Sequence, residues 1–529
     1  MKKIFFTLSI FAATLSFAQQ YAKGYVFEDT NNNGKKDRKE KGIPNISVSN
    51  GSDVVTSDQN GFYSIPVQDD NIIFVIKPSG YSTKIKENQL PEFYYIHKPQ
   101  GSPKNFKYKG VEPTGPLPKE INFPLNKQKE DNQFQILVFG DPQPYNQKEV
   151  DYFRRGIINE VKNNKKQAVF GITLGDLVGD NLNLHPEYIA SVQELQLPWY
   201  NVMGNHDMNY EAREDQHADE TFESHFGPAN YAFNYGKVHF IILDDILYPD
   251  PRDGKSYWGG FREDQLTFVE NDLKNTPKDH LVVVAFHIQM NPEKVGENTF
   301  RLEDRQRLFD ALKPFSNVLM MSAHTHKQSQ IFYTKKDGWE GQKDLHEYNV
   351  GTTSGDWYSG TIDEIGVPKS IMRDGTYRGY SYIDFDGNQY KIKYKTAGKP
   401  EDFQISLHLP KAIPFSLKTS ANIVANFFMG SKKDELFYRI DNGKWKKMKY
   451  TETFDPNYTH SVLEWDYTPE LMQGRRPNNP DESRHLWSVG FPRNLEKGKH
   501  TVEVKVTDRY GNTFTAKEDF SVEDVKIIP

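Results

Sequence analysis

Hydrophobic residues in the middle of the chain form short apolar runs that alternate with helical patterns. Val150, Phe153, Ile157, Ile158 and Val161 recur at the spacing of one helix face, and 308–315 repeats this pattern. The apolar runs have the length of buried strands, and a polar stretch follows each of them. They are 134–139, 170–174, 199–203, 240–243, 281–286 and 318–321. The alternation predicts an α/β domain whose parallel or mixed sheets are covered by helices.

On either side of this segment the pattern is typical of β-strands. Strands are predicted at 24–27, 46–48, 61–65 and 72–76, separated by turns rich in Asn, Gly, Asp and Ser. Towards the other end, 500–506 and 513–522 flank a turn and predict a hairpin. The first region resembles transthyretin-like modules, and the last resembles an immunoglobulin-like β-sandwich. The expected units are a module with its connector at 19–128, an α/β domain at 129–345 and a mainly β domain at 346–529.

Residues 1–18 have the pattern of a secretory signal peptide. Lys2 and Lys3 form a basic start, 4–15 is mostly apolar, and 16–18 offers small residues to a signal peptidase. We expect cleavage near Ala18 and export to the periplasm or the cell exterior. No later apolar run approaches the roughly 20 residues of a bilayer span, so the mature protein is expected to have none.

The composition excludes several kinds of chemistry. The 529 residues include no Cys, which removes disulfides, thiolate metal sites and Cys nucleophiles. The formal net charge is only -6, and the totals give no indication of a basic face for a nucleic-acid partner.

One polar loop in the first module has the spacing of a calcium-binding loop. Its oxygen donors fall at positions 1, 3, 5, 9 and 12, and Gly34 lies at the sharp turn. The donors are Asp29, Asn31, Asn33, Asp37 and Glu40. Two of them are neutral amides and several Lys and Arg residues surround them, so a structural calcium ion and a plain polar turn are both consistent with this loop.

The polar stretches that follow five of the apolar runs carry metal-ligating residue types. In order they are 140–143 (Gly-Asp-Pro-Gln), 175–176 (Gly-Asp), 204–207 (Gly-Asn-His-Asp), 286–287 (Phe-His) and 323–326 (Ala-His-Thr-His). The carboxyl ends of parallel strands are where α/β sheets place ligand sites. Oxygen and imidazole donors without thiolates suit hard or borderline divalent metals. The sequence therefore predicts a metal site at one edge of the sheets.

The order of these motifs resembles that of the calcineurin-like metallophosphoesterases. The resemblance covers about 200 residues and is most specific in Gly-Asn-His-Asp and His-Thr-His. Weaker matches at 352–357 and 374–376 resemble an exported bacterial branch that carries N- and C-terminal accessory domains. The resemblance implies a core of two packed β-sheets flanked by helices. It also implies two divalent ions, such as zinc, manganese or iron, about 3.5–4 Å apart.

Position by position, the resemblance assigns a role to each motif residue. Asp176 bridges the two ions. Asp141, Gln143 and His326 hold the first ion, and Asn205, His287 and His324 hold the second. His206 faces the substrate, and Asp207 orients or polarises it.

The implied reaction is the hydrolysis of a phosphoric ester, by a phosphatase or a phosphodiesterase. Two dications neutralise the anionic oxygens and lower the pKa of a bridging water, so that hydroxide can attack near neutral pH. His206 then protonates the leaving alkoxide as a general acid. No protein nucleophile is required.

Two positions depart from the pattern of related enzymes. Gln143 stands where many members have His, and a neutral carbonyl oxygen is a weaker donor than imidazole. Gly179 stands where purple acid phosphatases have Tyr, so an iron–tyrosinate centre is not expected.

The substrate is less clearly indicated than the reaction. Trp357 and Tyr358 are expected to contact it, because small and polar residues surround them. An alternative function is a catalytically degenerate binding protein that attaches to glycan or the cell surface through its β-domains. Such a core should have lost ligands, whereas every family position here carries a competent donor.

Overall fold

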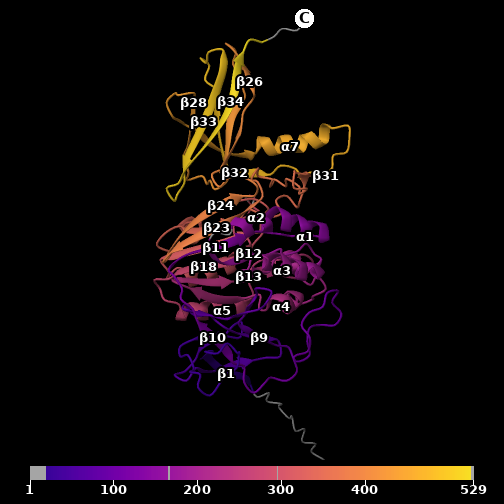
Figure 1. Ribbon diagram of the computed structural model, residues 1–529, viewed down its shortest axis with the longest axis vertical. Coiled ribbons are helices and arrows are strands. Elements are labelled where there is room, and N and C mark those ends of the chain that lie inside the picture. Colours follow the sequence, from indigo (N-terminus) through magenta and orange to yellow (C-terminus); the bar gives the residue numbers. More distant parts are fainter. Residues whose placement is uncertain (1–18, 165–166, 293, 295, 526–529) are drawn as a thin grey trace, which may run out of the picture.

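The computed structural model describes residues 19–164, 167–292, 294 and 296–525, and it arranges them in three tiers (Figure 1). A β-rich module formed by the start of the chain lies at one end, the α/β core lies in the middle, and a β-sandwich lies at the other end. The predicted signal peptide, residues 1–18, lies outside the described residues. No helix in the described part of the chain is long and apolar enough to cross a membrane.

The core contains two β-sheets, as the resemblance implied. The first has the order β13-β12-β11-β23-β24, with β11, β12 and β13 parallel. Its strands are β13 (Trp199–Val202), β12 (Ala168–Leu174), β11 (Gln133–Phe139), β23 (Gly379–Asp386) and β24 (Gln389–Thr396). The second has the order β14-β15-β18-β19-β21-β20, with its four middle strands parallel. Its strands are β14 (Tyr231–Tyr235), β15 (Val238–Ile242), β18 (Leu281–Ile288), β19 (Asn317–Ala323), β21 (Leu345–Asn349) and β20 (Ser329–Tyr333).

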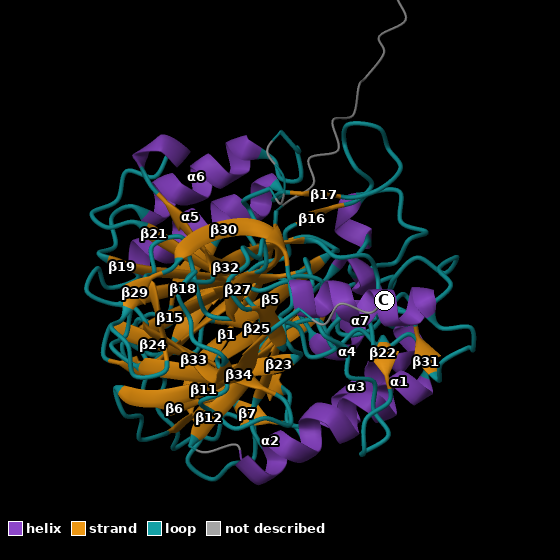
Figure 2. Ribbon diagram, turned by 90° about the horizontal axis from the view of Figure 1, so that it is seen from above, coloured by secondary structure: helices purple, strands orange, loops and turns teal. Residues whose placement is uncertain are grey.

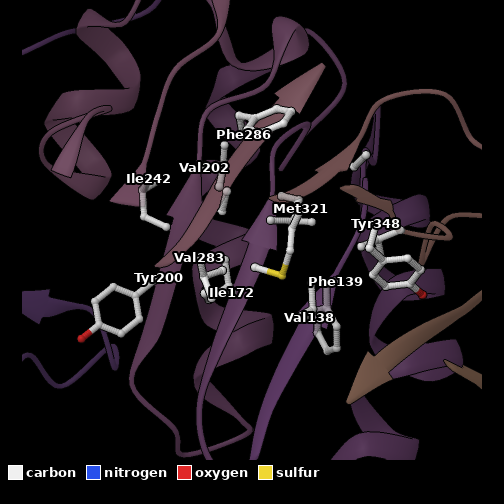
Figure 3. Packing of buried hydrophobic residues seen from close by; sticks show 14 of the residues in the cluster. Val138, Phe139, Ile172, Tyr200, Val202, Ile242, Val283, Phe286, Met321 and Tyr348 are labelled. Atoms are coloured by element: carbon white, nitrogen blue, oxygen red, sulfur yellow. The ribbon is translucent and has the colours of Figure 1, made fainter. Parts of the chain in front are cut away.

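Buried side chains of both sheets form the centre of the core (Figure 3). Val138 and Ile172 come from the first sheet, and Val283 and Met321 come from the second; all four are fully buried. The strands read as continuous apolar runs because the sheets are buried on both faces.

Helices cover the outer faces of the two sheets, with α5 and α6 on one side and α1, α2 and α3 on the other (Figure 2). The predicted helix around Val150 is present, but a π-helical turn, Arg154–Ile158, divides it into two α-helices. The helices of the core are α1 (Gln147–Phe153), α2 (Asn159–Asn164), α3 (His185–Gln193), α4 (Glu220–Phe226), α5 (Glu263–Asn275) and α6 (Leu302–Leu312). Short 3-10 turns occur at Leu182–Leu184, Asn205–Asp207, Asp215–His217 and Lys335–Asp337.

The core does not end at residue 345, where the sequence analysis placed its boundary. β21 pairs with β19 in the second sheet, and β23 and β24 extend the first sheet. Residues 379–396 therefore belong to the core, because their backbone hydrogen bonds cover the edge of β11. Unpaired strand edges are costly when buried, and this late hairpin closes one.

The N-terminal module contains two four-stranded sheets, ordered β4-β1-β10-β6 and β3-β2-β5-β9. Its strands are β1 (Gln20–Glu28), β2 (Ser47–Ser49), β3 (Val54–Thr56), β4 (Phe62–Val67), β5 (Asn71–Val75), β6 (Tyr81–Ser82), β7 (Lys84–Ile85), β8 (Pro91–Glu92), β9 (Tyr94–His97) and β10 (Phe123–Lys127). The end of the expected connector is thus a strand, β10, which pairs in parallel with β1.

A buried ion cluster joins this module to the core. The Lys98 ammonium lies 2.7 Å from carboxylate oxygens of Glu220 and Glu223 and 2.9 Å from Asp70. Asp70, His217 and Glu220 also have the geometry of a metal-ligating group. Lys98 already supplies a positive charge to two of these three residues, so the cluster serves as an ion-paired contact.

The C-terminal region forms the predicted β-sandwich. Its sheets have the orders β25-β27-β32-β30 and β26-β34-β33-β28-β29. The strands are β25 (Ile405–His408), β26 (Ala412–Pro414), β27 (Asn422–Phe427), β28 (Leu436–Ile440), β29 (Lys446–Lys447), β30 (Lys449–Phe454), β32 (Glu482–Gly490), β33 (Gly498–Thr507) and β34 (Thr513–Glu523), with helix α7 (Pro456–Tyr467) on one side. The predicted hairpin is β33–β34. Two further short pairs are β16 (Ile246–Leu247) with β17 (Trp258–Gly259), and β22 (Gly360–Thr361) with β31 (Gly474–Arg475).

Candidate metal centre

The five predicted motifs meet at the carboxyl ends of parallel strands from both sheets. Asp141, Asp176 and Asn205 follow β11, β12 and β13 in the first sheet. His287 lies near the end of β18 in the second sheet, and His324 follows β19. Residues separated by more than 180 positions are in contact here, since the backbone N–H of His324 donates to the Asp141 carboxylate at 3.2 Å.

Most of the expected ligands lie in loops with strained backbone conformations. Five of the seven have a positive φ: Asp141 (34°), Gln143 (40°), Asp176 (46°), His324 (68°) and His326 (51°). A left-handed conformation costs a residue with a Cβ of the order of 1–3 kcal/mol, and such residues cluster at functional sites. The fold therefore holds these side chains in positions that relaxed turns would not give them.

The first group of donor atoms surrounds the Nε2 atom of His287. This atom lies 3.2 Å from Oδ1 of Asp176, 3.1 Å from Oδ1 of Asn205 and 3.2 Å from Nδ1 of His324. The Nδ1 atom of His287 faces the carbonyl oxygen of Leu174 at 2.8 Å, which fixes Nδ1 as the donor and leaves Nε2 to bind. Two ligands bound to one ion at about 2.0–2.1 Å lie roughly 3.0–3.4 Å apart. The observed spacings therefore suit a shared cation.

The second group contains two buried atoms without a hydrogen-bond partner among the described residues. They are Oε1 of Gln143 and Nε2 of His326. The Nδ1 atom of His326 faces the carbonyl oxygen of Gly355 at 2.7 Å, so that ring is also oriented to present Nε2. Buried polar atoms are nearly always satisfied, and a metal ion would satisfy both of these. Gln143, the weakest donor in the sequence assignment, thus fits the site.

The protonation of the imidazoles also suits metal binding. Burial lowers the pKa of His324 to about 3 and that of His326 to about 4, so both rings are neutral and each retains a lone pair. Burial would also lower the pKa of His287, but the neighbouring Asp176 carboxylate outweighs this effect and raises the pKa of His287 to about 10. Positive charge is thus favoured between His287 and Asp176, where a dication would supply it.

The structure corrects the partner assigned to His206. Its Nδ1 atom lies 2.7 Å from Oδ1 of Asp180, a carboxylate whose side chain is 48% exposed. Burial opposes protonation of His206, but Asp176 and Asp180 outweigh it and raise the pKa of His206 to about 9. Asp180 was not among the residues predicted for the site, although a second Gly-Asp pair, at 179–180, follows the first after two residues.

Asp207 does not contact His206 and has a structural role instead. It is fully buried, and its carboxylate accepts the backbone N–H groups of Gly204 at 2.9 Å, Leu177 at 3.0 Å and Val178 at 3.2 Å. The Nε2 atom of His185 lies 3.2 Å away on the same carboxylate. Asp207 therefore fastens the loop of Asp176 to the loop that carries Asn205 and His206.

The Asp207→Asn substitution is expected to destabilise the protein by about 2–4 kcal/mol, because an amide nitrogen would face backbone donors in a buried network. Urea unfolding followed by tryptophan fluorescence measures the effect. Asp180→Asn is the matched control, since Asp180 is half exposed, and its stability should change by less than about 1 kcal/mol. An Asp207→Asn protein that unfolds like the wild type would contradict this role.

The two aromatic residues expected at the substrate have different positions. The Trp357 ring stacks on that of His326, with centroids 3.9 Å apart. Tyr358 is only 4% exposed, and its hydroxyl donates to the carbonyl oxygen of Pro142. Because it is enclosed, Tyr358 supports the loop between Asp141 and Gln143 and is not placed to contact a substrate. That expectation is therefore corrected, while substrate contact by Trp357 stays a prediction.

Three tyrosines lie around the metal site. The ring of Tyr145 lies 5.9 Å from that of His206, and the ring of Tyr257 lies 6.0 Å from that of His324. The Tyr210 hydroxyl lies 2.9 Å from Oδ1 of Asp180. A Cβ atom at Gly179 would lie 2.6 Å from the Tyr145 ring, so Tyr145 fills the space beside Gly179.

A segment after the core's second sheet holds the His324–His326 loop in place. The Asp374 carboxylate accepts the backbone N–H of Gln328 at 2.8 Å and lies 3.0 Å from Nε2 of His485. Arg373 donates to the carbonyl oxygen of Thr325 at 3.1 Å. The Asp-Gly-Thr motif at 374–376 thus links the metal-ligand loop to the C-terminal sandwich.

The expected calcium loop is closed by its own hydrogen bonds. The Asp29 carboxylate accepts the N–H groups of Asn33 at 3.2 Å and Gly34 at 2.8 Å. The amides of Asn31 and Asn33 both donate to Oδ2 of Asp37 at 2.8 Å. The loop is thus ordered by protein contacts, and a calcium ion at Asp29, Asn31, Asn33, Asp37 and Glu40 stays a prediction.

Comparisons with known proteins agree with the motif order. Three family models match the chain: "N terminal of Calcineurin-like phosphoesterase" at residues 30–111, "Calcineurin-like phosphoesterase" at 134–328 and "C terminal of Calcineurin-like phosphoesterase" at 347–514. No curated protein matches the sequence.

Among solved structures, the chain is similar to a dimetal phosphatase from Danio rerio, with 12% identity and a TM-score of 0.34 over 50% of this chain and 96% of that one. It is also similar to a purple acid phosphatase from yellow lupin (Lupinus luteus) seeds, with 10% identity and a TM-score of 0.36 over 67% of each chain. A metallophosphoesterase from Sphaerobacter thermophilus has 13% identity and a TM-score of 0.23 over 50% of this chain and 89% of that one.

Proposed function

The chain belongs to the calcineurin-like phosphoesterases, a metal-dependent family, and from this premise we propose that it hydrolyses phosphoric esters at a dinuclear centre with His206 as general acid. The observation that carries the proposal is the convergence of the donor atoms. Oε1 of Gln143 and Nε2 of His326 are buried without partners, beside a group of donors spaced 3.1–3.2 Å apart.

The residues divide between the two ions as the family order suggests. Asp141, Gln143 and His326 would hold one ion, Asn205, His287 and His324 would hold the other, and Asp176 lies between the two sets. Oδ1 of Asp176 lies 3.2 Å from Nε2 of His287, and its Oδ2 lies 3.2 Å from the amide nitrogen of Gln143. When bound, two such dications neutralise the charge of a phosphoryl group and make hydroxide available near neutral pH.

The protein's own acid is His206. Its Nδ1–H donates to Asp180, which orients the ring and leaves Nε2 to deliver a proton to the departing alkoxide. The hydrogen bond to Asp180 favours the protonated ring, because a carboxylate stabilises an adjacent imidazolium. The backbone N–H of His206 donates to Oδ1 of Asp176 at 2.9 Å, so the acid is fixed relative to the bridging residue.

The alternative of a degenerate binding protein is less consistent with the site. In a core that no longer binds metal, nothing would offset the strain of five ligand positions held in left-handed conformations. Selection for stability alone would replace Asp141, Asp176 and Gln143, whose Oε1 has no partner among the described residues, with residues that fit a relaxed, apolar interior.

Removal of the metals is expected to lower the turnover of aryl phosphate monoesters and diesters by at least about 100-fold, because metal activation contributes several kcal/mol. The measurement is steady-state turnover of the purified protein after dialysis against a chelator and after reconstitution with zinc, manganese or iron. Metal content should return to two ions per chain together with activity. Circular dichroism before and after dialysis is the control for folding. Undiminished turnover by folded, metal-free protein would contradict the proposal.

A further inference from the structure

The C-terminal region contacts the loop that lies against the metal centre. β31, which follows α7, lies beside β22 (Figure 2). The two strands pair in a register that puts Arg475 opposite Gly360. A few residues further on, the Asn478 backbone and side chain each donate to the Asp356 carboxylate at 2.8 Å. This domain therefore fixes the loop that contains Trp357.

That loop reaches a metal ligand directly. Gly355 provides the carbonyl oxygen that orients His326, and the Trp357 ring covers the His326 ring. Nη1 of Arg475 donates to the carbonyl oxygen of Trp357 at 3.5 Å, a long contact that leaves most of the guanidinium free. Arg475 thus contacts the residue whose ring stacks on His326, a candidate metal ligand.

Two adjacent arginines in this segment have different partners. Arg476 forms a bidentate pair with Asp466, with Nε and Nη2 at 2.7 Å and 2.8 Å from its carboxylate. Arg475 is exposed, and no carboxylate among the described residues forms an ion pair with it. The charge of Arg476 is therefore used in the structure, whereas that of Arg475 is available to a ligand.

Arg475 reaches the metal centre through Trp357. Its guanidinium contacts the carbonyl oxygen of Trp357, and the ring of the same residue stacks on that of His326 with centroids 3.9 Å apart. The exposed guanidinium is therefore placed beside the residue that covers a candidate metal ligand.

We propose that Arg475 forms an anion subsite at the mouth of the metal centre, and that the substrate is a phosphoester whose alcohol part carries a second negative charge. The proposal rests on the proposed function, because that reaction leaves this cation unused. The ions take the charge of the transferred phosphoryl group, and His206 takes the charge of the leaving oxygen. A guanidinium beyond both suits a carboxylate or a further phosphate, which it can bind through two parallel hydrogen bonds.

The test compares two aryl phosphates of equal size, 4-carboxyphenyl phosphate and its neutral analogue 4-carbamoylphenyl phosphate. The metal-reconstituted wild type is expected to favour the carboxylate about fivefold in kcat/KM, the value of one partly exposed ion pair. Arg475→Gln should remove this preference through KM with kcat unchanged, and Arg475→Lys should restore part of it. Raised salt should weaken the preference of the wild type, because it screens exposed charges.

Arg476→Gln is the matched control and should keep the preference. Equal kcat/KM for the two esters in the wild type would overturn the subsite and leave the proposed function standing. An equal loss on both esters in Arg475→Gln would also overturn it, because it would show a purely structural role. Failure of the reconstituted wild type to hydrolyse either ester would overturn the proposed function and the subsite together.

Discussion

Asp176→Asn is expected to lower kcat/KM on aryl phosphates by about a thousandfold, or ~4 kcal/mol of transition-state stabilisation. The Asp176 carboxylate contacts donors of both sets. Its oxygens lie 3.2 Å from His287 and from Gln143, and it accepts the backbone N–H of His206. An amide of the same shape offers one neutral oxygen, so it cannot bridge two cations or balance their charge.

Steady-state kinetics and metal content should be measured on the same samples, with the number of bound ions falling below two per chain. Asp272→Asn is a suitable control, because Asp272 is another buried carboxylate that contacts a histidine, His239, at 2.7 Å, outside the centre. Its kcat/KM should match that of the wild type. An Asp176→Asn protein with wild-type rates would show that the dinuclear assignment is wrong.

His206→Ala is expected to lower the hydrolysis of alkyl phosphates by about a thousandfold and that of 4-nitrophenyl phosphate by only about tenfold. An alkoxide leaves poorly without a proton, whereas 4-nitrophenolate is stable enough to leave without one. Asp180→Asn should show the same dependence on the leaving group with smaller losses, of about tenfold on alkyl esters, because it weakens the acid without removing it. The measurement is a plot of kcat/KM against leaving-group pKa for each variant.

A steeper plot for His206→Ala than for the wild type is the sign of lost general-acid catalysis. Equal losses on aryl and alkyl esters would show that His206 acts in another way, for example by binding the phosphoryl group. A steeper plot for Asp207→Asn, together with unchanged stability, would show that Asp207 assists His206 as the sequence indicated.

Individual strands and the C-terminal hairpin could be predicted, because each depends on a pattern within its own few residues. A buried strand needs an apolar run of its own length, so β11, β12, β18 and β19 were visible wherever such runs occur. The β33–β34 hairpin was visible for the same reason, since the turn between its strands has suitable residues. The hairpin β23–β24 was not assigned to the core, because nothing within 379–396 says that β11 is its neighbour. That pairing joins residues about 250 positions apart.

At the metal centre, too, some features could be predicted from the sequence and others depended on the tertiary structure. The residue types that gather at the strand ends could be predicted, because metal chemistry without thiolates restricts the candidate ligands to carboxylate, amide and imidazole. The partner of His206 could not, because Asp207 is its neighbour in the sequence, whereas Asp180 lies 26 residues away. The turn at Asn205–Asp207 directs Asp207 inward to three backbone N–H groups and leaves His206 facing Asp180. Only the path of the backbone distinguishes the two.

The sequence by itself determined the class of site, the α/β core between two β-rich regions, and the candidate metal ligands. Those features depend on residue type and short-range periodicity, which a single chain displays directly. The tertiary structure alone decided which carboxylate contacts His206, which aromatic residue is enclosed, and that Arg475 contacts the backbone of Trp357. These outcomes depend on contacts between residues far apart in the chain, and such contacts are set by how the sheets, loops and domains pack together.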